Sequence, residues 1–386
     1  MEVKLIHDEE GFQSLKKGWK ELQSMGGVKN ITVTWEWMST WWDVFKQGRE
    51  LAVLIAEQEG KLIGIAPLIK RKVKNFWFIP YERLELLASG EEERDDICSD
   101  YLDFISRPGF EKDFLEAILR FLCHSRSIRW EELLLPKLDA ESSTIPLLFD
   151  VISRFDLKIE KFDQELCPYA ILPSSPEAFL AKLGKNTRRN IRRSLGRMNK
   201  AGKPVYQLAD TEKDVEKAKA ILIKLHQLRW TSKGKPGVFS SEKFRAFHER
   251  MISLAYKNGW LRLGTLFLDD KPLACEYNLR FNDKIMAYQA GFDATADRKT
   301  SIGLVGMVFA INHAISEGAA EYDFLTGVSD YKANLAKDRH KIATVRIAKP
   351  SGRETIYRGI REGLKVLKKC VRFSKSVKLR GATGNQ

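Results

Sequence analysis

The sequence has little cysteine and no long apolar run, and these two absences exclude several kinds of protein. It has an odd number of cysteines, and no two of them have CxxC spacing: Cys98, Cys123, Cys167, Cys275 and Cys370. We therefore expect neither a disulfide framework nor a bound metal such as zinc. No uncharged apolar run approaches the roughly 18 residues of a membrane span. The first residues are charged instead of forming a signal peptide, which favours a cytoplasmic protein.

Acidic residues are scarce in two stretches that carry most of the positive charge. Nine Lys or Arg and no acid lie between Glu177 and Asp210, and residues 353–380 hold ten basic residues against Glu354 and Glu362. The formal net charge is +14. Such a charge favours anionic partners, for example phosphates, nucleotides, nucleic acid or a lipid surface. Apolar residues make up 44% of the chain, enough for full cores.

Helical and strand-like patterns alternate along the chain, which predicts an α/β protein. In the first half, the predicted strands are 51–58, 62–70, 75–79, 83–88, 101–106 and 130–135, with a helix at 111–124. In the second half, the predicted strands are 260–268, 272–281, 284–291 and 321–325, with a helix at 301–317. Helices at 186–201, 211–230 and 241–257 are predicted between the halves, and a basic helix at 354–373 closes the chain.

Two turns align at an offset of 210 residues, 59–61 and 269–271, and the elements after them follow in the same order. Chance similarity of two hairpins is one explanation. A duplicated domain explains the shared order better. We therefore predict an N-terminal lobe at 1–165, a C-terminal lobe at 166–350 and a helical tail at 351–386.

The segment from 287 to 303 is the best candidate for a binding site. A strand ends near Gly291, a loop follows, and a helix begins at Ser301. The unpaired amides and the dipole of a helix N-terminus suit a pyrophosphate, and Gly303 permits close approach of the backbone. An ordinary capped helix is the alternative. The candidate donor-binding residues are Ala290, Gly291, Arg298, Thr300, Ser301, Ile302 and Gly303.

The spacing Arg298-x-x-Ser301-x-Gly303 resembles the donor-loop motif of the GNAT acyltransferase superfamily, with Ser301 in place of the first glycine. Over residues 1–350 the chain resembles the acetyltransferases of the cellulose-biosynthesis type, which are related to Fem-type peptidyl transferases. The stretches that carry this resemblance are 35–37 with 41–42, 99–104, 225–230, 288–293, 301–303, 322–327 and 331–332. The resemblance implies two tandem GNAT-like lobes, each with a mixed sheet flanked by helices. It also implies acetyl-CoA or another acyl-CoA as donor and an amine or hydroxyl of a small molecule or sugar as acceptor.

Two residues are candidates for the proton transfers of such a reaction. Glu276 lies in an otherwise apolar strand, so it needs a partner or a purpose, and we predict that it is the general base. A structural ion pair or a solvated strand face is the alternative. Tyr331 follows the strand at 321–325, close to where GNAT enzymes often place a tyrosine acid, and a surface aromatic residue is its alternative. An activated thioester needs no covalent nucleophile, and the sequence offers no persuasive one.

Five more residues are candidates for binding the acceptor. His226, Arg229 and Trp230 have helical spacing on one face, where they could bind a polar acceptor or be structural. Asp323 could orient Lys332 or cap a turn. Residues 233–237 after this helix look like a mobile loop.

The basic helices allow further partners. Arg188, Arg189, Arg192 and Arg193 form a cationic stripe that is either a solvated face or a surface for an anionic acceptor or tRNA. The tail helix could rest on an anionic membrane surface or on its own domain. The alternative functions are therefore an aminoacyl-tRNA-dependent transferase of the Fem type and a non-enzymatic nucleic-acid-binding protein. The sequence leaves the oligomeric state open.

Overall fold

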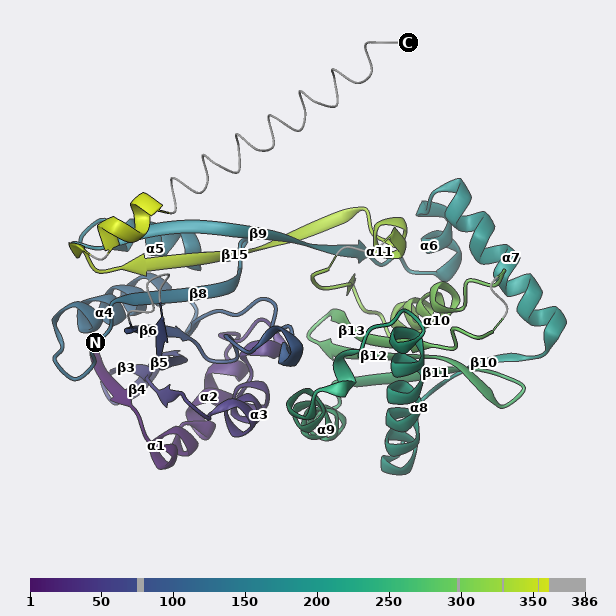
Figure 1. The fold of residues 1–386 in the computed structure, drawn as a ribbon, viewed down its shortest axis with the longest axis horizontal. Coiled ribbons are helices and arrows are strands. Elements are labelled where there is room, and N and C mark those ends of the chain that lie inside the picture. Colours follow the sequence, from purple (N-terminus) through teal and green to yellow (C-terminus); the bar gives the residue numbers. More distant parts are fainter. Residues whose placement is uncertain (75–79, 297–298, 328–329, 353, 361–386) are drawn as a thin grey trace, which may run out of the picture.

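The protein is built from two α/β lobes that lie side by side (Figure 1). The computed structural model describes residues 1–74, 80–296, 299–327, 330–352 and 354–360, without four side chains: Asp163, Gln164, Asp330 and Tyr331. The predicted strand 75–79, Arg298 and the chain beyond 360 therefore lie outside the described residues. No helix in the described part of the chain is both long enough and apolar enough to cross a membrane.

Within the residues that the structure describes, the first lobe contains a small four-stranded sheet and five α-helices. The strand order of this sheet is β1 (Glu2–Ile6), β3 (Val53–Gln58), β4 (Lys61–Ala66) and β7 (Ile105–Ser106). The helices are α1 (Glu9–Ser14), α2 (Lys16–Ser24), α3 (Trp35–Phe45), α4 (Glu111–His124) and α5 (Thr144–Ile152). Helix α4 has the predicted bounds, because its apolar residues recur at helical spacing and bury one face.

An eleven-stranded sheet runs through both lobes. In spatial order its strands are β10 (Pro204–Leu208), β11 (Leu261–Leu268), β12 (Lys271–Phe281), β13 (Lys284–Phe292), β14 (Glu321–Asp323), β9 (Lys158–Ile171), β15 (Asp338–Ala348), β8 (Glu132–Asp139), β6 (Pro80–Leu86), β5 (Leu68–Lys74) and β2 (Glu50–Leu51). The long antiparallel pair β9 and β15 reaches from one lobe to the other (Figure 1). This pair therefore joins the lobes through backbone hydrogen bonds.

The second lobe carries six helices among the described residues. They are α6 (Pro176–Lys182), α7 (Lys185–Ala201), α8 (Glu212–Thr231), α9 (Glu242–Lys257), α10 (Ile302–Ser316) and α11 (Asp330–Leu335). Thr211 and Ser241 accept hydrogen bonds from backbone amides of the first turns of α8 and α9, so both helices begin where a side-chain cap is available. The predicted helices at 186–201, 211–230, 241–257 and 301–317 are confirmed to within a residue or two.

The two turns that align in the sequence adopt the same backbone conformation. Glu59 and Gly60 have φ angles of 54° and 71°, and Asp269 and Asp270 have φ angles of 45° and 64°. Two successive residues with positive φ are typical of type I′ hairpin turns. The hairpins lie in different sheets, β3–β4 in the small sheet and β11–β12 in the large one.

The predicted strand at 101–106 is wrong except for its last two residues, which form β7. Tyr101 has a φ of 62°, outside the range of a strand. Its hydroxyl instead donates to Asp323 of the second lobe at 2.6 Å. The neighbouring Asp100 accepts from the amide of Thr326 at 2.9 Å and from its hydroxyl at 2.7 Å. Contacts between the lobes, which the local pattern does not contain, override the strand signal in this segment.

The start of the basic tail is helical and docks on the first lobe. Glu354 forms a buried ion pair with Arg346, which also pairs with Glu132 of β8 at 2.7 Å. Arg358 reaches Glu160 of β9 at 2.9 Å. The described part of the tail, up to residue 360, therefore packs against its own domain.

Candidate active site

Strands β13 and β14 are parallel neighbours that separate after three residues. The first pair is Lys284 with Glu321, and the last is Met286 with Asp323. Strand β13 then continues to Phe292 without β14 beside it. On its other side, the register of β13 with β12 shifts at Tyr288, which has no partner and forms a β-bulge. The separation leaves one edge of β13 open to ligands.

Two cavities lie along this edge. The loop-side cavity has a volume of about 340 Å³. Its walls are formed by Asn190, Arg229, Glu276, Ala290, Phe292, Ser301, Gly303, Leu304, Met307 and Asn334. The lobe-interface cavity has a volume of about 260 Å³ and includes Cys98 of the first lobe. Its other walls are Arg229, Trp230, Glu276, Ala287, Tyr288, Gln289, Ala290, Met307, Phe324, Leu325, Thr326, Gly327 and Lys332.

Glu276 lies where the two cavities meet. Four residues line both of them: Arg229, Glu276, Ala290 and Met307. Glu276 is 1% exposed, and no described residue forms a hydrogen bond with its Oε2. Its Oε1 lies 2.9 Å from the point where a Cβ on Gly306 of α10 would stand, so only a glycine leaves room there. Burial raises the pKa of Glu276 well above its ordinary range, although the charge of Arg229 partly opposes this.

Arg229 is held between two aromatic rings at the same junction. Its guanidinium carbon lies 4.8 Å from the ring centre of Phe292 and 5.6 Å from that of Trp230. Its Nε is buried without a hydrogen-bond partner. No acidic side chain of the described residues forms an ion pair with it, so its charge is available to a ligand.

Helix α7 supports the predicted donor loop. The side chain of Asn190 donates to the hydroxyl of Ser301 at 3.1 Å, and the amide of Ser301 donates to Ser194 at 3.2 Å. Arg197 bonds to the carbonyl of Lys299. These three residues of α7 follow at helical spacing, so one face of the basic helix holds the start of α10 in place.

Three of the predicted donor residues line the loop-side cavity, namely Ala290, Ser301 and Gly303. A Cβ at Gly303 would lie 2.8 Å from the ring of Phe292. The first turn of α10 contains no acid. The amide of Ile302 donates to the carbonyl of Thr300 at 2.9 Å and that of Val305 to the carbonyl of Ser301 at 3.0 Å, whereas those of Gly303 and Leu304 have no acceptor within the helix.

Of the other predicted donor residues, Gly291, Thr300 and Ile302 line neither cavity. Ile302 is buried in the apolar core. Gly291 faces α8, where a Cβ would lie 2.5 Å from the amide nitrogen of His226. Thr300 lies in the loop before α10, and Arg298 is outside the described residues.

His226 lies in an aromatic cluster and lines neither cavity. Its ring centre is 5.0 Å from that of Phe239 and 6.0 Å from that of Trp230. Burial lowers the pKa of His226 to about 4, so its ring is neutral. Arg229 and Trp230 line a cavity and His226, although it packs on Trp230, does not, which supports the structural alternative for this histidine.

Of the two roles considered for Asp323, the structure favours the turn cap over the contact with Lys332. The ammonium of Lys332 donates to the carbonyls of Phe324 at 2.6 Å and Thr326 at 2.8 Å. Asp323 accepts from Tyr101, as described above, and from the amide of Leu325 at 2.7 Å. Lys332 therefore fixes the chain after β14, which forms one wall of the lobe-interface cavity.

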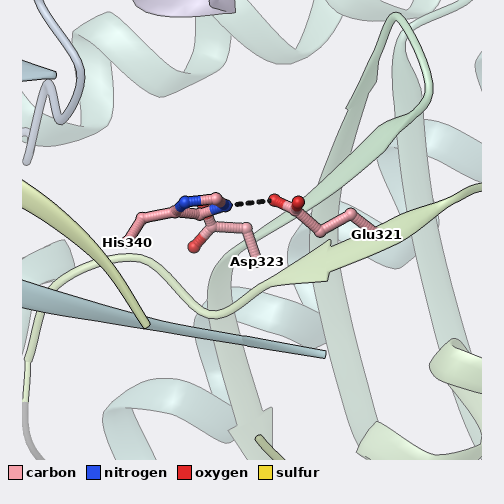
Figure 2. Close-up of side chains that lie close together, drawn as sticks. All are labelled: Glu321, Asp323 and His340. Carbon is pink, nitrogen blue, oxygen red and sulfur yellow. Dashed lines mark hydrogen bonds and ion pairs between the residues drawn. The ribbon is translucent and has the colours of Figure 1, made fainter. Parts of the chain in front are cut away.

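Figure 2 shows Asp323 beside two other groups, Glu321 and His340, that are close enough to share a cation. The two ring nitrogens of His340 already lie 2.9 Å from Glu321 and 2.8 Å from Glu141. Burial by itself lowers the pKa of His340, but these hydrogen bonds outweigh it and raise the pKa to about 9. A protonated His340 that donates to two carboxylates accounts for this geometry.

Several cavity residues carried no clear signal in the sequence. Asn190 lies in an arginine-rich helix, and only its helical spacing with Ser194 and Arg197 could have indicated a common face. Phe292, Met307 and Asn334 come from three different elements. Tyr331 belongs to α11, the helix that supplies Lys332 and Asn334, and its side chain lies outside the described residues.

The comparisons with known proteins place a GNAT-type domain in the second of these α/β lobes. Residues 185–333 match the sequence model of the Acetyltransferase (GNAT) domain, so the second lobe contains a GNAT-type domain. The crystal structure of FemX is similar over 89% of this chain and 97% of that chain, with a TM-score of 0.60 and 11% identity. A conserved protein of unknown function from Bacteroides thetaiotaomicron is similar over 90% and 100%, with a TM-score of 0.52 and 10% identity. No curated protein matches the sequence.

Proposed function

We propose that the protein transfers an acyl group, in the first instance acetyl, from an acyl-CoA to an amine or hydroxyl of a small molecule or sugar. The observation that carries this proposal is the buried, unpartnered carboxyl of Glu276 at the junction of two cavities. A donor in one cavity and an acceptor in the other would meet at this carboxyl. The matching GNAT domain supports the class of reaction.

The loop-side cavity suits the donor. It ends at Ser301 and Gly303, where the first turn of α10 offers backbone amides and no acidic side chain. Such a turn is suited to a pyrophosphate. The residues present therefore fit a CoA thioester, whose thioester end would reach towards Glu276.

The reaction needs few groups from the protein. The acceptor nitrogen or oxygen forms a bond to the thioester carbonyl carbon, the carbon–sulfur bond breaks, and the acceptor proton passes to Glu276. The sulfur leaves as a thiol after taking a proton, and Tyr331 is the proposed donor of that proton. The cavities contribute by holding the reacting atoms together and excluding water. A carboxyl with a raised pKa is a stronger base than an exposed one.

The test measures thiol release from acetyl-CoA and longer acyl-CoAs in the presence of primary amines and amino sugars. Glu276→Gln should lower kcat by roughly 10²-fold or more, because it removes the base, and leave the affinity for CoA unchanged. Tyr331→Phe should likewise lower turnover and not CoA affinity. Glu10→Gln, an exposed change on α1, serves as the control. An unchanged melting temperature with millimolar CoA would count against a CoA donor.

A second candidate is aminoacyl transfer from tRNA, as in Fem-type enzymes. It is favoured by α7, whose Arg189, Arg192 and Arg193 are exposed on the helix that supports the donor loop. Replacing Arg188, Arg189, Arg192 and Arg193 by Gln should weaken tRNA binding and flatten its salt dependence. Binding of tRNA with neither thioester cleavage nor aminoacyl transfer would favour the non-enzymatic alternative. The cellulose-biosynthesis branch, the cytoplasmic location and membrane contact of the tail remain predictions.

A further inference from the structure

Three cationic side chains surround one tryptophan beside the lobe-interface cavity. The distances to the ring centre of Trp230 are 5.6 Å for Arg229, 5.7 Å for Lys233 and 5.5 Å for Lys235. We call these four residues the Trp230 patch. Within the described part of the chain, none of the three cations forms an ion pair with an acid. Positive charges gathered without counter-ions repel one another, so a bound anion would stabilise the arrangement.

The loop that carries the two lysines is fixed by hydrogen bonds. The amides of Lys233 and Lys235 both donate to the carbonyl of Trp230 at 3.0 Å, and Gln227 donates to the carbonyl of Pro236 at 2.8 Å. Gly234 has a φ of 69°, the left-handed conformation that closes a helix C-terminus. The backbone of this loop is therefore held against the end of α8 before a ligand arrives, which disagrees with the mobile loop predicted from the sequence.

The patch belongs to the acceptor side of the site. Trp230 lines the lobe-interface cavity and not the loop-side cavity, whereas Arg229 lines both. The buried, unpartnered Nε of Arg229 marks the inner end of the patch. The other cation in this cavity wall, Lys332, is already bound by backbone carbonyls. Free positive charge in this cavity therefore comes from the patch.

Glu276 supplies the complementary group at the inner end of the same cavity. Among the described residues it is the one acid in the cavity wall, and its Oε2 is unpartnered. A ligand that satisfies both ends has a group that gives a proton to Glu276 and an anionic group towards Trp230. The cavity volume of about 260 Å³ limits the enclosed part to a small molecule.

We propose that the acceptor is a small anionic amine, bound through its carboxylate or phosphate by the Trp230 patch and through its amine at Glu276. This inference rests on the proposed acyl transfer and adds the chemical class of the acceptor. Arg229 offers a forked donor for the oxyanion, and the two lysines add charge at the mouth. The amine is then the atom that attacks the thioester.

The experiment compares amines that differ in one anionic group: phosphoethanolamine with ethanolamine, glucosamine 6-phosphate with glucosamine, and alanine with its methyl ester. Two measurements are made for each, kcat/KM from thiol release with acetyl-CoA, and binding by calorimetry without acetyl-CoA. The anionic member of at least one pair should be preferred by about tenfold, as a charge-assisted contact predicts. Preference within the phosphate pairs or within the alanine pair identifies which anion is recognised.

A double variant tests the patch itself. Lys233→Gln with Lys235→Gln should reduce the preference about three- to tenfold, since two partly exposed charge contacts are lost. Lys224→Gln, an exposed change on α8, should leave the preference unchanged. Three results would overturn the proposal. The preference for the anionic amine could survive in the double variant, no pair could show a preference in either measurement, or the double variant could lose CoA affinity instead of the preference. If the protein neither binds CoA nor releases thiol, but still binds the anionic amine selectively in calorimetry, only the proposed reaction is overturned.

Discussion

At the scale of single residues, the buried carboxyl of Glu276 destabilises the folded state and is the proposed base of the reaction. A carboxyl that is buried without a partner resists ionisation, so the folded state holds its proton to higher pH than the unfolded chain does. Between the ordinary pKa of 4.5 and the raised one, unfolding releases a proton, and the free energy of unfolding falls as pH rises.

Glu276→Gln should therefore affect stability and rate in opposite directions. The variant should melt about 2–4 °C above the wild type at mildly alkaline pH, where the wild-type carboxyl is driven to ionise, and the difference should vanish in acid. In the wild type, kcat should rise with pH through the raised pKa, and this limb should be absent from the variant. Calorimetric melting across pH and a pH–rate profile measure the two effects. Equal melting curves of the variant and the wild type at every pH would contradict the destabilisation that we assign to burial of the Glu276 carboxyl.

His340 stabilises the folded state, whereas Glu276 destabilises it, although the raised pKa of each group makes the free energy of unfolding fall as pH rises. The pKa of His340 is raised to about 9, so the stability that it contributes is fully present below its ordinary value of 6.5 and is lost as pH rises towards 9. His340→Gln removes the charge that bridges Glu321, which Figure 2 shows beside it, and Glu141. We expect a loss of about 2 kcal/mol near neutral pH and no difference in strong alkali. Denaturant unfolding at several pH values measures this.

His124→Gln is the control for His340. In the described part of the chain, the ring of His124 bonds to the carbonyl of Arg120 and to no acid, so its replacement removes no bridge between carboxylates. A pH-independent loss in His340→Gln would show that the ring acts by packing on Tyr169, with which it stacks at 3.8 Å.

At the scale of elements, the start of α10 depends on its neighbours. Ser194 of α7 takes the amide of Ser301, and the ring of Phe292 lies against Gly303. The sequence placed the stripe of arginines on α7 outside the donor loop and favoured an effect on the acceptor. The structure places α7 against the donor loop, so we now expect its exposed arginines to affect the donor.

Gly303→Glu should remove the stabilisation that CoA gives. The new side chain would meet the ring of Phe292 and bring a negative charge to the helix start, where the pyrophosphate is expected. Gly303→Gln has nearly the same bulk without the charge, and it should keep more of the thermal shift. Thermal melting with and without CoA measures both. A full CoA shift in Gly303→Glu would move the donor away from this loop.

At the scale of the whole molecule, the two lobes share a fold but not a site. In the first lobe, the helix that corresponds to α10 is α4, and its first turn contains Glu111 and Asp113. These acids repel phosphate, whereas the first turn of α10 has none. The first lobe instead supplies Cys98, Asp100 and Tyr101, which form or fix walls of the cavity in the second.

We therefore expect one CoA site per chain. Isothermal titration should give a stoichiometry of one, and reversing the charge of the α4 turn with Glu111→Lys should not change it. Two equivalent sites would show that the first lobe binds donor as well. The control is Gly303→Glu, in which the single site should be lost.

Much of this protein follows from its sequence alone. Helical spacing determines α4, α8, α9 and α10, and side-chain caps add to it at α8 and α9, because those signals lie within one element. The aligned turns at Gly60 and Asp270 adopt matching conformations, whereas the duplication and the role of Glu276 stay predictions. The helices and turns rest on interactions between residues near one another in the chain.

The tertiary structure decided what depends on residues far apart. It turned the expected strand at 101–106 into a loop, because Asp100 and Tyr101 bond to the second lobe. It separated His226 from Arg229, since a helix face does not specify which of its side chains reach a cavity. It brought Asn190, Glu276 and Ser301 to the same cavity from three elements. Burial and ion pairing depend on such distant neighbours, and local patterns in the sequence do not record them.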